Sequence, residues 1–84
     1  MRQETQQINK MLCIVVDALV DVTNDVQINV LEGQSVVVFE VFVAKCDIGK
    51  IIGKQGATIQ SIRRILEGVS AKNRTSYIIQ VVED

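Results

Sequence analysis

The chain has 84 residues, 48% of them hydrophobic, with no proline and no histidine. This composition excludes disordered, collagen-like and proline-rich chains, and the length predicts one domain with a modest core. The net charge of −1 conceals two regions, because Lys45–Arg74 has seven basic and two acidic side chains and a net charge of +5, whereas the rest is acidic. This segregation favours a phosphate-bearing partner, although a solvated helical surface would give the same pattern.

The two cysteines, Cys13 and Cys46, are too few for a disulfide framework. We therefore expect reduced thiols and a cytoplasmic protein. No apolar run approaches the roughly 20 residues needed to span a bilayer, and no signal sequence follows Met1. The chain is predicted to be a single domain over residues 1–84 without a membrane partner, with residues 1–5 forming a flexible N-terminal tail.

Apolar residues at helical spacing predict a first helix from Ile8 to Val22. These apolar positions are Ile8, Met11, Leu12, Val15, Leu19 and Val22. Thr5 is the predicted N-cap of this helix and Asn24 its predicted terminator.

Three strands are predicted from alternation and from β-branched residues. Val26–Val30 alternates at period two, and the residues from Glu32 to Ser35 supply a turn. Val36–Val43 is an almost continuous apolar run, which is typical of a strand in the centre of a sheet. The last strand is predicted at Tyr77–Val82.

A helical region separates the second and third strands. Asp47 is predicted to cap a short helix that ends at Ile52, and Gly53 and Gly56 interrupt the pattern. A longer helix begins near Ala57. Its apolar positions are Ile59, Ile62, Leu66 and Val69.

The predicted order is therefore α-β-β-α-α-β, an α+β fold. A hairpin makes the first two strands antiparallel, and a two-helix crossover makes the second and third parallel. We expect a three-stranded mixed sheet with all helices on one face.

The two glycines three residues apart are the most informative feature of the chain. They allow a tight turn and a close approach of backbone to ligand, and the amides that follow Gly56 belong to a helix N-terminus, which favours anions. Lys54 adds a free ammonium group. Neighbouring isoleucines provide an aliphatic floor, although Ile59 and Ile62 also fit a purely structural role in the core.

Residues 51–62 read Ile-Ile-Gly-Lys-Gln-Gly-Ala-Thr-Ile-Gln-Ser-Ile. This stretch resembles the signature of the KH family, and the element order resembles its type II, prokaryotic arrangement. The resemblance implies a short bacterial single-domain KH protein whose GXXG loop clamps about four nucleotides of single-stranded RNA. The implied backbone clamp is Gly53, Lys54, Gln55 and Gly56. The other implied RNA-binding residues are Lys50, Ile51, Ile52, Ala57, Thr58, Ile59 and Arg63.

Other ligand classes fit less well. A P-loop around Gly49–Gln55 has its glycines one residue too close, and Gln55 stands where a serine or threonine must hold magnesium. Without histidine or an evident carboxylate constellation, we expect no enzyme, no metal, no cofactor and no small-molecule substrate.

A protein–protein module is the alternative function. If Glu40 and Gln80 point away from the helices, an apolar set shares their face of the sheet, and such a face marks an interface. This set is Val38, Phe42, Ile78 and Val82. The resemblance implies a regulator of RNA-chaperone type that acts after transcription, either as a homodimer or as a heteromer with a larger RNA-binding protein.

Overall fold

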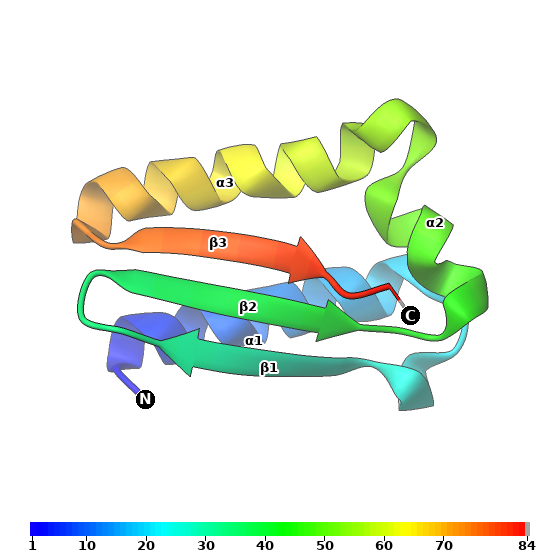
Figure 1. The fold of residues 1–84 in the computed structure, drawn as a ribbon, viewed down its shortest axis with the longest axis horizontal. Coiled ribbons are helices and arrows are strands. Elements are labelled where there is room, and N and C mark those ends of the chain that lie inside the picture. The colour runs from blue at the N-terminus through cyan, green and yellow to red at the C-terminus, as the bar shows by residue number, and fades with distance from the viewer. Residues whose placement is uncertain (84) are drawn as a thin grey trace.

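Three helices and three strands follow one another in the predicted order in the computed structural model, which describes residues 1–83 (Figure 1). The elements are α1 (Gln3–Leu19), β1 (Gln27–Glu32), β2 (Val36–Phe42), α2 (Ile48–Ile52), α3 (Ala57–Asn73) and β3 (Ser76–Val81). Single 3-10 turns lie at Thr23–Asp25, Lys45–Asp47 and Lys54–Gly56. The bounds of the strands and of α2, and the start of α3, differ from the predicted ones by no more than one or two residues.

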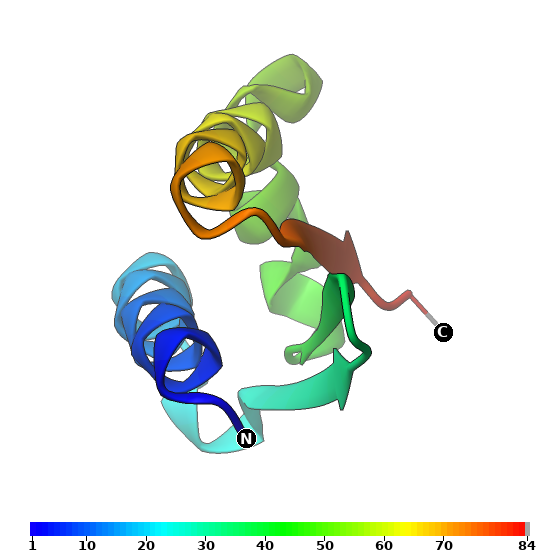
Figure 2. The same ribbon diagram turned by 90° about the vertical axis from the view of Figure 1, so that its left-hand side faces the viewer.

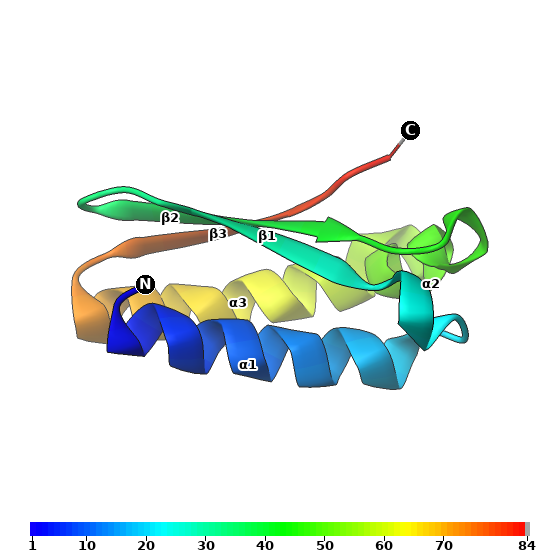
Figure 3. The ribbon, with the colours of Figure 1, turned by 90° about the horizontal axis from the view of Figure 1, so that it is seen from below.

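The three strands form one mixed sheet in the order β1-β2-β3. β1 pairs with β2 in antiparallel fashion, and β2 pairs with β3 in parallel. Both long helices, α1 and α3, lie side by side on the same face of this sheet (Figures 2 and 3). The predicted α+β fold with a three-stranded mixed sheet is confirmed.

The core lies between the sheet and the two long helices. The inward side chains of the central strand, Val37, Phe39 and Val41, are fully buried, as the apolar run predicts. The ring of Phe39 lies 6.4 Å from that of Tyr77 on β3, in a tilted arrangement. Burying a side chain of this kind contributes roughly 1.5–3 kcal/mol, so these residues fix the sheet against the helices.

The opposite face of the sheet carries the side chains that alternate with the core. Glu40 and Gln80 lie on this outer face, which meets the condition stated for the protein–protein alternative, and the β2 and β3 positions between the buried ones are half-buried or exposed. One row across the three strands is apolar. It consists of Leu31, Val38 and Ile78, which are paired in register, and Leu31 is 51% and Ile78 43% exposed.

The start of α1 differs from the prediction. The helix begins at Gln3, and Thr5 is no N-cap, because its buried hydroxyl donates to Glu32 Oε2 at 2.6 Å. Arg2 also donates to Glu32, and its guanidinium reaches the carbonyls of Gly33 and Gln34. Residues 1–5 are therefore part of the folded structure and do not form the free tail that we expected.

The end of α1 also lies earlier than predicted, at Leu19. Val20 is extended and buried, and the backbone N–H groups of Asp21 and Val22 donate to the carboxylate of Asp47. These bonds draw the chain out of the helix before Asn24. Asp47 is thus engaged with the α1–β1 connection and does not cap α2 with its side chain, which corrects a second prediction. None of the helices described in residues 1–83 is long and apolar enough to cross a membrane.

Candidate nucleic-acid interface

The loop between α2 and α3 has an unusual backbone. Gly53 adopts φ 78° and ψ 174°, and Gly56 adopts φ 77° and ψ 13°. Between them Gln55 is also left-handed, with φ 57° and ψ 26°. Three of the four loop residues thus have a positive φ, and the tight turn that they form is closed by the Gly56 N–H, which donates to the Gly53 carbonyl at 3.1 Å.

The two glycines serve different purposes. A Cβ on Gly53 would lie 2.2 Å from Thr58 Oγ1 and 2.8 Å from the Thr58 amide nitrogen, so this residue packs directly against the first turn of α3. A Cβ on Gly56 would meet no heavy atom within 4 Å other than those of the residues next to it in the chain. Gly56 therefore borders open space, into which a ligand can approach the backbone.

Backbone and side-chain groups contribute differently at the start of α3, where the Gly56 and Ala57 N–H groups already donate to the carbonyls of Gly53 and Lys54. In the part of the chain that the structure describes, no side chain caps this helix. The first amides of an α-helix have no acceptor within the helix, and the dipole of a 17-residue helix places partial positive charge at the same end. Lys54 and Gln55 are exposed beside it. Together these groups can hold a phosphate.

The isoleucines around the loop divide between core and surface. Ile51 is fully buried, and Ile59 and Ile62 are about 5% exposed, so all three belong to the hydrophobic core. These three side chains anchor the helices on either side of the loop in the core. Ile52 is half-buried and remains the isoleucine of the set that offers aliphatic surface at the loop.

The charged residues assigned to the site from sequence have different surroundings. Arg63 is exposed on α3, beyond the loop. Lys50, in contrast, lies 3.0 Å from Asp47 Oδ1 and 3.2 Å from Asp21 Oδ2. The hydrogen bond to Asp47 raises the pKa of Lys50, and the Val22 N–H and Lys50 lower the pKa of Asp47. Sequence reasoning missed this cluster, although the spacing of Asp47 and Lys50 on one turn was a signal.

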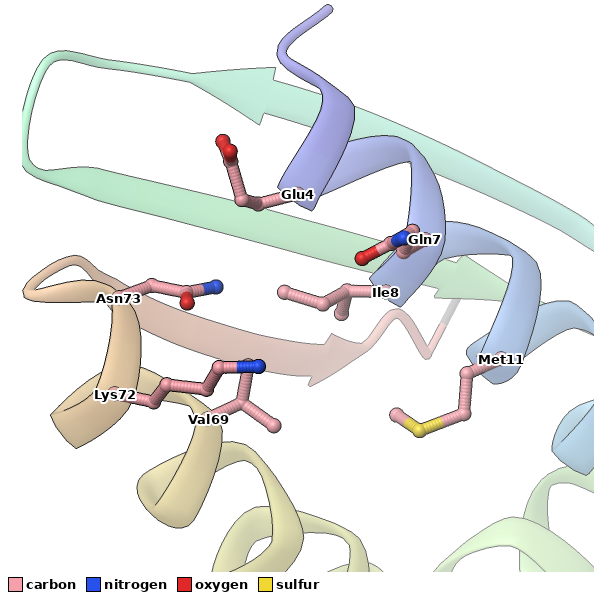
Figure 4. Close-up of a pocket in the computed structure, with 7 residues that line it drawn as sticks. All are labelled: Glu4, Gln7, Ile8, Met11, Val69, Lys72 and Asn73. Carbon is pink, nitrogen blue, oxygen red and sulfur yellow. The ribbon is translucent and has the colours of Figure 1, made fainter.

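A separate groove of about 460 Å³ lies between α1 and α3, toward the C-terminal end of α3 (Figure 4). Apolar side chains form its floor, and polar ones form its rim. The lining residues are Glu4, Gln7, Ile8, Met11, Val69, Lys72 and Asn73. None belongs to the Gly53–Gly56 loop, so this groove is not part of the candidate site. Residues 1–83 contain no group of three or more cysteine, aspartate or glutamate side chains placed to hold a metal ion.

Comparison with known proteins shows the family of the chain. Residues 9–81 match the family model described as KhpA/KhpB, KH domain. The RNA-binding protein KhpA of Chlamydia caviae is 40% identical over 73 residues, which cover 87% of this chain and 94% of that protein. The RNA-binding protein KhpA of Borreliella burgdorferi is 33% identical over 69 residues, covering 82% of this chain and 84% of that protein.

A third relative, the RNA-binding protein KhpA of Caldanaerobacter subterraneus, is 34% identical over 68 residues, covering 81% of this chain and 91% of that protein. No solved structure matches the chain. The family match includes α2, the loop and α3, together with all three strands. The chain belongs to the KhpA/KhpB family of KH domains.

Proposed function

We propose that this protein binds single-stranded RNA through the Gly53–Gly56 loop. The observation that carries the proposal is the coincidence of an open backbone at Gly56 with the uncapped N-terminus of α3. Amides at such a helix end bind phosphate. The printed names of the relatives, which describe RNA-binding proteins, support the same ligand.

In this mechanism the backbone supplies most of the contacts. A phosphate lies against the amides of the loop and of the first turn of α3, and Lys54 contributes a mobile positive charge. Ile52, which is half-buried, and Arg63, which is exposed, are the further residues proposed to contact the RNA. Because bases must be unstacked to reach an aliphatic surface, single strands are the favoured ligand. We expect no cofactor, no metal, no catalysis and a cytoplasmic protein.

Reversing the charge of the loop tests the proposal. The double variant Lys54→Asp/Gln55→Asp retains both glycines, and aspartate tolerates the left-handed conformation at residue 55. We expect binding to a short unstructured RNA to weaken at least about tenfold with a nearly unchanged melting temperature, because two like charges then face the phosphate. The control Gln3→Asp/Lys10→Asp makes the same change in net charge on α1 and should bind like the parent. Equal binding by the loop variant and the parent would remove the loop from the mechanism.

Salt dependence and strand preference provide a second test. About four nucleotides place roughly three phosphates on the protein, so log affinity should fall with log salt at a slope near about −2. This slope corresponds to a loss of roughly twentyfold between about 50 and 200 mM salt. A preference for duplex RNA in the same titrations would contradict the proposal that the site binds unstacked bases.

Association with a protein is the second candidate function, and the outer face of the sheet favours it. Leu31, Val38 and Ile78 form an apolar row there. Covering roughly 300 Å² of apolar surface on each partner would contribute on the order of 15 kcal/mol before association costs of roughly 4 to 15 kcal/mol. Because these two amounts nearly balance, we propose weak to moderate association, either as a homodimer or as a heteromer with a larger RNA-binding protein. Two loops in one particle would raise RNA affinity through effective concentration.

A further inference from the structure

The helix that leads into the loop cannot hold its own position. α2 has five residues, and helices this short are not stable without tertiary contacts. The orientation of α2 determines where Gly53–Gly56 lies relative to the start of α3. Ile51 anchors α2 to the core through apolar contacts. The polar contacts that position its N-terminal end come from Asp47.

The side chain of Asp47 is fully buried and accepts hydrogen bonds from three donors. Its Oδ1 accepts from the Asp21 N–H at 3.2 Å and from Lys50 Nζ at 3.0 Å, and its Oδ2 accepts from the Val22 N–H at 3.0 Å. A buried carboxylate is tolerated only when such partners are present, so its place is narrowly defined. Because two of the donors are backbone groups, the carboxylate ties the entrance of α2 to the α1–β1 connection.

Lys50 completes this arrangement from within α2. Its ammonium group lies between Asp47 and Asp21, at 3.0 and 3.2 Å. The three side chains together carry two negative charges and one positive charge. Lys50, whose side chain is 42% exposed, is therefore already paired with the buried Asp47 and the exposed Asp21, unlike a lysine that extends freely toward a ligand.

We propose that Asp47 and Lys50 form a latch that positions the Gly53–Gly56 loop for RNA, and that Lys50 makes no contact with phosphate. This inference rests on the proposed RNA-binding function and removes Lys50 from the contact residues expected from the sequence. Asp47 and Lys50 act on RNA binding only through the position of the loop, so both are positioning residues. Lys54 lies on the loop itself and is the lysine proposed to contact phosphate, so it is the reference with which Lys50 must be compared.

The experiment compares the parent with Asp47→Asn, Lys50→Gln, Lys50→Arg and Lys54→Gln in two readouts. The first is hydrogen exchange of the RNA-free protein, read over residues 48–58 with β2 as an internal reference. Because the Lys50 ammonium is 42% exposed, Lys50→Gln should accelerate exchange in residues 48–58 only severalfold, and Asp47→Asn, which removes a buried carboxylate, should accelerate it more. The second is the affinity for a short unstructured RNA as a function of salt.

A latch and a contact give different salt slopes. Lys50→Gln should weaken binding severalfold with the slope unchanged, and Lys50→Arg should restore both exchange and affinity. Lys54→Gln should lower the magnitude of the slope by about 0.7, the value for one phosphate contact on a single strand. If Lys50→Gln lowers the slope by the same amount, Lys50 contacts phosphate and the inference is wrong.

Two further outcomes separate the latch from the function on which it rests. If Lys50→Gln changes neither the exchange rate nor the affinity, the latch is wrong. This result decides the question even if Asp47→Asn is too unstable to measure. If the parent fails to bind the RNA, the proposed function fails. The exchange readout uses no RNA, so it still decides whether Asp47 and Lys50 hold the loop.

Discussion

Alanine substitutions at the two loop glycines should have unequal effects on stability. Gly53 lies in a backbone region that is essentially restricted to glycine, and an L residue there costs of order 1–3 kcal/mol. The added methyl group would also lie 2.2 Å from Thr58 Oγ1, and relieving such overpacking costs typically another 1–3 kcal/mol. Gly53→Ala should therefore lower the free energy of unfolding by about 3 kcal/mol or more.

Gly56→Ala meets no such obstacle. Its Cβ enters open space, and only the left-handed conformation is unfavourable, at about 1 kcal/mol. For a domain of this size 1 kcal/mol corresponds to roughly 4–8 °C in melting temperature, so Gly53→Ala should lower it about three times as far as Gly56→Ala. Thermal unfolding followed by circular dichroism measures the difference. Gly68→Ala, in the interior of α3 with free space around it, is a control that should raise the melting temperature. Equal losses at Gly53 and Gly56 would refute the packing argument.

Three further predictions concern stability and association. Arg74 ends α3 in a left-handed conformation, so Arg74→Gly should raise the unfolding free energy by about 1 kcal/mol in urea titrations, whereas Arg74→Ala should not. Hydrogen bonds from Thr5 and Arg2 lower the pKa of Glu32 to about 2, so its contribution to stability is complete above about pH 4.5 and is lost toward pH 2. The stability difference between the parent and Glu32→Gln should therefore disappear over that range, and a constant difference contradicts the assignment. In sedimentation at micromolar concentration, Ile78→Lys should weaken self-association, and a loss seen instead with Ile65→Lys, at an exposed site on α3, would place the interface on that helix.

The sequence predicts those features that depend on local pattern. The apolar run Val36–Val43 was sufficient to place β2 in the centre of the sheet, but only Glu40 indicated its outer face, so that assignment stayed conditional until the structure showed Phe39 buried. The spacing of Gly53 and Gly56 was sufficient to locate the loop, because their conformations follow from the absence of a Cβ.

Features that depend on distant partners were not predictable in this way. Thr5 matches an N-cap pattern, yet its hydroxyl bonds to Glu32, 27 residues away. Asp47 likewise matches a helix cap, but its acceptors are used by amides 25 and 26 residues earlier in the chain. Local spacing cannot distinguish a carboxylate that caps its own helix from one that reaches another element. For Lys50 likewise, the charge was visible in the sequence but its partners, Asp21 and Asp47, were not.

The central claim is that RNA phosphate lies against the loop amides and the start of α3. Titration of the labelled protein with a short unstructured RNA, followed by amide chemical shifts, tests it most directly. We predict the largest shifts for the amides of residues 54–59, with little change at the outer-face residues Leu31 and Ile78. Saturable binding that leaves the amides of residues 54–59 unshifted and moves those of the outer sheet face would contradict the account.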